Sequence, residues 1–368
     1  MISNVICNSA KQGLIPQREY FDKDIANSDN TNGYYIIESN DFVYNPRKSA
    51  DAPYGPISSY QYPEAGIVSP LYLCFRAKRE INPLYFEWYF RSSTWHRYIY
   101  MSGDSGARHD RVSIKDDVFF AMPINVPSAK EQERISLFLD AIERRIETQR
   151  TLVETLKKYK RGVISALLSS KTNPYYSSET WKEVALCDVA SGFEYGMNAA
   201  ATVYDGSHKY IRITDIDDNS HLYSQDVPVS PEGQVDEKYR VRESDILFAR
   251  TGASVGKSYR YQRSDGDLYY AGFLIRIHVN SDVNCGYVFQ NTLTEAYRRW
   301  VLLESARSGQ PGINAEQYKQ YRFLLPPLEL QNKISTLATN LDNLICKEEN
   351  LLSQIEQVKI ALLQRLFI

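Results

Sequence analysis

The sequence lacks the residue patterns that metal binding, secretion and membrane insertion require. Its five cysteines are scattered without a C-x-x-C pair, and its five histidines include no H-x-x-x-H pair. We therefore expect neither a disulfide framework nor a metal site. No apolar run reaches the roughly 18 residues of a membrane span, and no apolar segment follows a basic start. These absences favour a protein of the reducing cytoplasm that does not enter membranes.

No charge of one sign dominates. Lysine and arginine total 43 against 45 acidic residues, which gives a formal net charge of -2. Any contact with nucleic acid must therefore come from local basic patches, for which a handful of Lys and Arg residues suffices. Tyrosine is abundant, with 28 copies, but it serves both recognition surfaces and the cores of β-rich domains. The length of 368 residues is typical of two domains.

The chain contains an internal repeat. Residues 135–168 align with residues 334–367 without a gap, at an offset of 199. Apolar residues recur in heptads along both segments, which is typical of a coiled-coil seam. The same offset pairs residues ahead of the segments, Pro127 with Pro326 and Gln132 with Gln331. Polar residues interrupt the two seams at the same two places, which are Gln149 and Lys160 in the first and Glu348 and Lys359 in the second.

These interruptions predict how the two helices pair. Parallel packing in the matching register would set Lys160 against Lys359, a like-charge pair in an apolar seam. One antiparallel register instead sets Lys160 against Glu348 and Gln149 against Lys359. Polar seam residues are best attested as devices of register and orientation, so we predict this antiparallel register. The alternative is that each helix packs separately on its own domain.

The segments before the helices, 1–126 and 171–325, share an order of motifs. GYYIIESNDFVYNP at 33–46 resembles EKYRVRESDILFAR at 237–250. Farther on, residues 82–99 match the amphipathic pattern of residues 286–303, and in both copies a Gly/Arg/Ser loop and a short strand ending in proline follow. Each unit is therefore α+β and is followed by a long helix.

The two copies differ at their openings. The second begins with WKEVALCDVA at 181–190, which has no counterpart in the first. Either the first domain is N-terminally shortened or it is built on a different plan. The predicted division has four parts: a first globular domain at 1–126, a central spacer helix at 127–170, a second globular domain at 171–325 and a C-terminal spacer helix at 326–368.

The segment ARTGASVGKS, at 249–258, resembles a phosphate-binding loop but has the wrong spacing. Gly252 and Gly256 enclose three residues where such a loop needs four. A tight turn between strands fits better, and we assign no catalytic residue. The DNA-binding candidates are Arg, Lys, His, Gln and Asn side chains on loops, suited to phosphates and base edges. They are Arg47 and Lys48; Arg108, His109 and Arg111; Arg212; Arg250, Lys257 and Arg260; and Arg307, Gln310 and Asn314.

With these features the sequence resembles the specificity subunits of type I restriction–modification systems. The resemblance rests on WKEVALCDVA, on ESDILFARTGASVGKS, on the paired lead-ins VPSAKEQERI and LPPLELQNKI, and on the two long helices. Residues 8–24, NSAKQGLIPQREYFDKD, resemble one variety of first target-recognition domain in that family. The implied fold is α+β, with two α/β target-recognition domains separated by two long helices that form an antiparallel coiled coil.

The resemblance also implies a function. Each domain would read one half of a split site in double-stranded DNA, and the helices would hold the halves apart. The chain would dock two methyltransferase (modification) subunits and the restriction (motor-nuclease) subunits. It would bind no cofactor itself, since S-adenosylmethionine, ATP and Mg²⁺ belong to those partners. A repeat helix of 34 residues spans roughly 50 Å, or around one and a half turns of DNA. The alternatives are a stand-alone DNA-processing enzyme and a coiled-coil adaptor.

Overall fold

The computed structural model describes residues 4–20, 31–103, 110–224, 227–306 and 311–367. The chain forms two compact units. The first unit comprises residues 1–152 and 348–368, and the second comprises residues 153–347. Each unit thus contains one globular part and a portion of both long helices, α5 (Ala129–Leu167) and α10 (Leu328–Leu366).

The globular part of the first unit combines short antiparallel strands with short helices. The strands are β1 (Ile6–Ser9), β2 (Gly13–Pro16), β3 (Tyr35–Ile37), β4 (Phe42–Tyr44), β5 (Ile57–Ser59), β6 (Gly66–Val68) and β7 (Leu73–Phe75). The helices are α1 (Gln17–Tyr20), α2 (Pro83–Arg91), α3 (His96–Ser102) and α4 (Asp116–Phe120). β1 pairs with β2, β3 pairs with β6, and β4 lies between β5 and β7. Aromatic residues of α2 pack with Phe42 and Tyr44 to form the main core.

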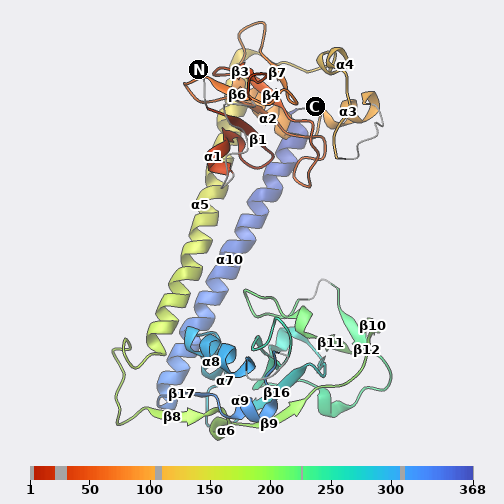
Figure 1. The fold of residues 1–368 in the computed structure, drawn as a ribbon. Coiled ribbons are helices and arrows are strands. Elements are labelled where there is room, and N and C mark those ends of the chain that lie inside the picture. Colours follow the sequence, from red (N-terminus) through yellow and green to blue (C-terminus); the bar gives the residue numbers. More distant parts are fainter. Residues whose placement is uncertain (1–3, 21–30, 104–109, 225–226, 307–310, 368) are drawn as a thin grey trace. The chain divides into compact units, whose positions relative to one another are not determined.

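The globular part of the second unit is larger and contains a four-stranded sheet in the order β14-β13-β16-β9. The strands are β8 (Lys182–Ala185), β9 (Ala190–Tyr195), β10 (Ala201–Val203), β11 (Lys209–Ile211), β12 (Val229–Pro231), β13 (Asp245–Ala249), β14 (Ser258–Arg260), β15 (Leu268–Tyr270), β16 (Leu274–Val279) and β17 (Arg322–Leu325). The helices are α6 (Leu186–Val189), α7 (Cys285–Asn291), α8 (Glu295–Ser305) and α9 (Ala315–Lys319), with 3₁₀ turns at Ile213–Asp215, Glu237–Tyr239 and Arg263–Asp265. Helices α7 and α9 pack against the sheet (Figure 1).

The predicted match between residues 33–46 and 237–250 is confirmed in backbone detail. β4 and β13 are both central strands with antiparallel neighbours on each side. The turn before each strand holds a non-glycine residue at positive φ, Asn40 at 71° and Ser244 at 67°. The next residue is a buried aspartate that accepts a backbone N–H from three residues earlier, at 2.8 Å for Asp41 and 2.7 Å for Asp245. The acidic turn is thus a structural element of both units.

The two openings differ, as the sequence predicted. In the second unit, β8 pairs with β17, which directly precedes α10. Among the described residues of the first unit, no strand pairs with the corresponding segment before α5. Residues 6–16 form a hairpin instead, and its Ile6 and Leu14 are buried with Val43. This hairpin supports the alternative that the first recognition domain has a different plan.

The long helices run antiparallel within each unit, which confirms the predicted orientation. In the first unit, Gln149 contacts Glu348, and Glu143 earlier on α5 contacts Lys359 later on α10. In the second unit, Lys160 contacts Asp342, and Ile164 belongs to the same buried cluster as Ala338. The predicted seam positions Leu139, Ile146, Val153, Ile334, Ala338 and Ile345 are all buried. The helices therefore form a shared seam, and the alternative of separate packing is wrong.

The predicted register of this seam is wrong. Lys160 Nζ lies 2.5 Å from Asp342 Oδ1, not near Glu348. Gln149 Nε2 donates to Glu348 Oε2 at 2.6 Å, while Lys359 pairs with Glu143. The residue numbers of each lysine–acid pair sum to 502, whereas the predicted pairs summed to 508. The difference is close to one heptad of about seven residues.

The packing of the helix ends explains why the observed register differs from the predicted one. A heptad pattern specifies which face of each helix is apolar, but not which heptad faces which. Phe367, next to the last residue, lies against Tyr85 and Tyr89 of α2, with ring centroids 5.3 and 5.8 Å apart. At the other end of α10, Ile334 is buried in the core of the second unit. These contacts with the globular parts select the register. Among the described residues, no helix has the length and apolar content of a membrane span.

Candidate nucleic-acid interface

The first candidate interface is formed where the segment after β4 meets the segment before α4. Lys48 N–H donates to Asp110 O at 2.9 Å, and Val112 N–H donates to Pro46 O at 2.8 Å. Arg47 and Arg111 form an antiparallel bridge between these segments. We call residues 46–48 and 110–112 the first loop junction. Arg47 and Arg111, two candidates from distant parts of the sequence, thus lie side by side.

The first loop junction concentrates positive charge. In an antiparallel bridge the paired side chains lie on one face, about 5 Å apart at Cβ. Arg47 and Lys48 are exposed and Arg111 is half-buried. Among the residues that the structure describes, none of the three forms an ion pair with an acidic side chain. Adjacent guanidinium groups without acidic partners are well suited to phosphate oxygens.

The second unit contains an equivalent junction. Ile313 N–H donates to Arg250 O at 2.9 Å, Gly252 N–H donates to Pro311 O at 3.3 Å, and Thr251 forms a bridge with Gly312. We call residues 250–252 and 311–313 the second loop junction. It lies at the same place in the fold, after the central strand and before the short helix α9. The bridge positions carry Thr251 and Gly312 where the first unit carries two arginines.

The glycine-rich segment 249–258 is a turn between strands, as predicted. β13 ends at Ala249 and β14 begins at Ser258. Gly252 and Gly256 have φ values of 76° and 84°. A Cβ on Gly256 would lie 2.6 Å from the side chain of Val301, so this glycine admits close packing of α8 under the turn. The turn holds the second loop junction against a helix.

Two of the proposed DNA-binding cations are engaged inside the second unit. Lys257 Nζ donates to Ile216 O at 2.9 Å and pairs with Asp218, and its side chain is only 11% exposed. Arg212 makes two hydrogen bonds to Asp215, at 2.8 and 2.7 Å, which raise the pKa of its guanidinium. Both side chains therefore hold the loop that follows β11.

Three further candidates contact other groups of the second unit. The guanidinium groups of Arg250 and Arg260 lie 4.8 Å from the ring centroid of Tyr195 and 5.7 Å from that of Phe289. Asn314 is the N-cap of α9, and its side chain accepts the N–H of Gln317 at 2.9 Å. Arg108, His109, Arg307 and Gln310 lie outside the described residues.

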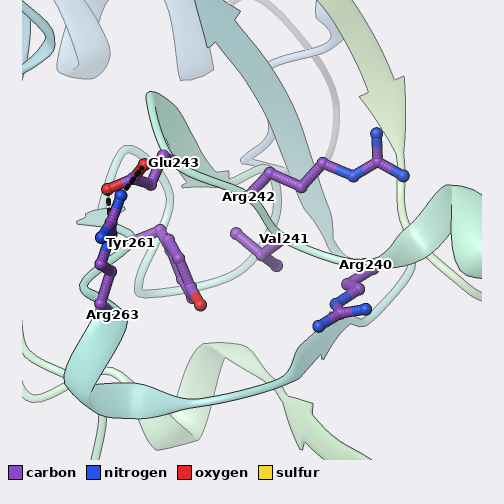
Figure 2. Close-up of a pocket in the computed structure, with 6 residues that line it drawn as sticks. All are labelled: Arg240, Val241, Arg242, Glu243, Tyr261 and Arg263. Atoms are coloured by element: carbon purple, nitrogen blue, oxygen red, sulfur yellow. Dashed lines mark hydrogen bonds and ion pairs between the residues drawn. The ribbon is translucent and has the colours of Figure 1, made fainter.

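Sequence reasoning missed a basic pocket of about 550 Å³ in the second unit. Figure 2 shows Arg240, Arg242 and Arg263 around it, together with Tyr261 and Glu243. Arg263 is paired with Glu243 at 2.5 and 2.6 Å, and Arg240 is paired with Asp267, whereas Arg242 is exposed. The signal was present in the segment YRVRES, whose arginines alternate along an extended chain. In the first unit Glu38 occupies the position of Arg242, so this arginine is not repeated there.

Comparison with known proteins finds a family model and relatives that match this chain. Residues 178–357 match the type I restriction modification DNA specificity domain. The type I restriction enzyme StySPI specificity subunit of Salmonella potsdam is 23% identical over 309 residues, which cover 79% of this chain and 66% of that subunit. The chain therefore spans just under two thirds of this relative's length.

Solved structures share the fold over most of the chain. The HsdS subunit from Thermoanaerobacter tengcongensis gives a TM-score of 0.50 at 17% identity, covering 90% of this chain and 81% of that one. The S subunit of a type I system from M. genitalium gives 0.56 at 13% identity, covering 94% and 87%. A chain from a structural study of assembly and conformational transition in the type I R-M system gives 0.58 at 16%, covering 90% and 82%. Residues 178–357 therefore match the type I restriction modification DNA specificity domain, and the chain shares its fold with solved type I specificity subunits.

Proposed function

We propose that this chain is the DNA-specificity subunit of a type I restriction–modification complex and reads a bipartite site in double-stranded DNA. One observation carries the proposal: both units repeat the same frame, and each ends in a loop junction at the same place in that frame. A duplicated frame with different junction residues is what recognition of two different half-sites requires. The central spacer helix at 127–170 and the C-terminal one at 326–368 would connect the recognition domains at 1–126 and 171–325.

At the first loop junction, Arg47, Lys48 and Arg111 would contact phosphates and base edges. Arginine is the side chain best suited to the bidentate edge of guanine, and lysine to a phosphate. At the second, Arg250 and the segment from Arg307 through Gln310 to Asn314 would do so, assisted by Arg242. The two junctions would then read unlike sequences because their side chains differ.

The long helices would also dock partner subunits. Beyond the seam, exposed apolar residues recur at heptad spacing on both helices. They are Phe138, Leu152 and Tyr159 on α5, and Leu337, Leu344 and Val358 on α10. An exposed apolar stripe on a helix, in addition to the apolar face that forms the seam, favours packing against a further helix. Since it occurs on both repeat copies, we propose that it receives two methyltransferase subunits, with the restriction subunits joining them.

Catalysis would lie in those partners. The methyltransferase subunits would bind S-adenosylmethionine and methylate adenine, and the restriction subunits would bind ATP and Mg²⁺. Because the proposed substrate is duplex DNA inside the cell, the site of action would be the cytoplasm. The alternatives are a stand-alone DNA-processing enzyme and a coiled-coil adaptor, and one experiment distinguishes them.

The experiment is co-expression of the chain with a methyltransferase subunit of its own genome in a host without adenine methylation, followed by purification and methylome sequencing. We expect the two to co-purify and a split adenine-methylated motif to occur only when the chain is present. Equal methylation without the chain would contradict the proposal. Activity of the chain alone on DNA would favour the stand-alone enzyme.

A further inference from the structure

A buried glutamine occupies the same position in the first turn of each long helix. Gln132 on α5 is 5% exposed and Gln331 on α10 is 3% exposed. The repeat offset relates them, yet a buried glutamine at the polar start of a helix is uncommon and needs hydrogen-bond partners. Both ends of each side-chain amide have such partners in the structure.

In the first unit the glutamine joins two pieces of backbone. Gln132 Nε2 donates to Pro127 O at 2.9 Å, in the lead-in to α5. Its Oε1 accepts the N–H of Asn82 at 3.1 Å, at the N-cap of α2. Asn82 in turn accepts the backbone N–H groups of Leu84 and Tyr85. The start of α2 is therefore fastened to the start of the spacer helix.

The second unit repeats these contacts. Gln331 Nε2 donates to Pro326 O at 2.8 Å, and its Oε1 accepts the N–H of Asn284 at 2.9 Å. Asn284 is the N-cap of α7 and accepts the N–H of Tyr287. The hydroxyl of Tyr287 adds a bond of 2.6 Å to Leu324 O, just before the lead-in. We call Gln132 with Asn82, and Gln331 with Asn284, the two amide latches.

The latches recur although most of the residues around them differ. The exceptions are the N-cap asparagine and the tyrosine three residues later, and the hydroxyl of Tyr85 donates to Asn125 O at 3.5 Å as that of Tyr287 does to Leu324 O. The helix after the first latch reads PLYFEWYFR and the helix after the second reads CGYVFQN. A side-chain amide supplies one donor and one acceptor from the same group, whereas a carboxylate lacks the donor and an aliphatic side chain lacks both. Since the two latches share the residue type, the distances and the two backbone partners, they set one defined junction between recognition domain and helix.

We propose that Gln132 and Gln331 are positioning residues of DNA recognition: each fixes the angle at which its recognition domain joins its spacer helix, and thereby the spacing between half-sites that the subunit accepts. The inference rests on the proposed function. Neither side chain is assigned a contact with DNA, so half-site sequence is independent of them. Loosening a latch widens the range of accepted spacings.

The first test addresses the latch itself and is independent of DNA. Gln132→Met and Gln331→Met keep the side-chain length and remove the amide. Hydrogen exchange on the full chain should then accelerate by about tenfold at Asn82 or Asn284, respectively, and only there. The matched controls Glu133→Gln and Lys333→Gln alter exposed neighbours and should leave both amides unchanged. Unchanged exchange at Asn82 and Asn284 in the methionine variants would overturn the proposal.

The second test addresses positioning, in the complex with the methyltransferase subunits. Once the wild-type motif is known, methylation is measured on duplexes with the native spacer and with one base pair more or fewer. We expect the preference for the native spacer to fall by roughly tenfold in either methionine variant, with unaltered half-sites. Equal losses on all duplexes, or an unaltered preference, would overturn the inference. Absence of any split motif in the wild type would instead defeat the proposed function.

Discussion

The two units share the same backbone arrangement but carry different side chains at equivalent positions. At the bridge of the loop junction, the first unit has Arg47 and Arg111 where the second has Thr251 and Gly312. At the acidic turn, Glu38 of the first unit stands where the second has Arg242. The frame is held by backbone hydrogen bonds, caps and a buried aspartate, none of which depends on these residues. The fold can therefore be duplicated while the residues at the loop junction and the acidic turn of each copy diverge.

The largest expected effect concerns the buried residues that join each unit to its helix ends. Phe367 at the end of α10 and Leu168 just after α5 correspond in the repeat, and both are buried, in the first and second unit respectively. Phe367→Ala should lower the free energy of unfolding by about 3–5 kcal/mol and Leu168→Ala by about 2–5 kcal/mol. Hydrogen exchange should place each loss in its own unit. Equal loosening of both units by either substitution would contradict their separate cores.

The next effect tests whether the junctions act separately. Arg47→Glu with Arg111→Glu should weaken DNA binding by the complex by about a hundredfold and lower the salt slope by about two. Sequence preference should relax in one half-site only. Glu64→Gln, at an exposed position of the same unit outside the loop junction, is the control and should change neither. Relaxation of both half-sites together would mean that the junctions are not independent readers.

A smaller effect concerns the seam. Gln149 is 2% exposed, and the side chain and carbonyl of Glu348 accept its hydrogen bonds. Glu348→Leu should cost about 1–3 kcal/mol in chemical unfolding, because it removes the side-chain acceptor of a buried amide. Adding Gln149→Leu should recover most of that loss, since both polar groups are then absent. A double variant as unstable as the sum of the single ones would show that the two residues do not interact.

The smallest effect is a difference in pH dependence. The buried aspartate of the acidic turn pairs with Arg76 in the first unit and with His278 in the second. Burial raises the pKa of Asp245. A raised pKa in the folded state gives stability that is present below the unfolded value of about 3.9 and is lost as pH rises through the folded value.

The measurement is thermal unfolding of the wild type and Asp245→Asn at pH values from about 4 upward. The wild type should lose stability relative to the variant as pH rises through this window. A constant difference between Asp245→Asn and the wild type at all pH values would contradict the assignment.

The sequence was sufficient to predict the features that depend on the internal repeat and on the heptad periodicity. Heptads and matched interruptions predicted the helices, their seam and their antiparallel orientation. The predicted register was wrong by about one heptad. Phe367 and the residues near Ile334 select the register through contacts with the globular parts, and the heptad pattern carries no information on these contacts. The match of Pro127 with Pro326 and of Gln132 with Gln331 was visible, but the amide latches depend on backbone partners distant in sequence.

The candidate site was predicted only in part, again because it depends on contacts between residues that are distant in the sequence. The motifs YNPRKS and SGARHDR were identified separately, and only the fold brings Arg47 beside Arg111. Charge alone could not distinguish a cation that faces outward from one engaged inside, as Lys257 and Arg212 are. The pocket at Arg242 was missed because its lining combines the segment at 240–243 with Tyr261 and Arg263, which only the fold brings together.

The central proposal is that the paired helices set the length of the spacer between the two half-sites. Its most direct test is the methylome of a variant that lacks residues 156–162 and 340–346, one heptad from each helix. This matched deletion removes both partners of the Lys160–Asp342 pair and retains the Gln149–Glu348 pair. The account predicts the same two half-sites with a shorter spacer between them. An unchanged spacer between the same half-sites would contradict it.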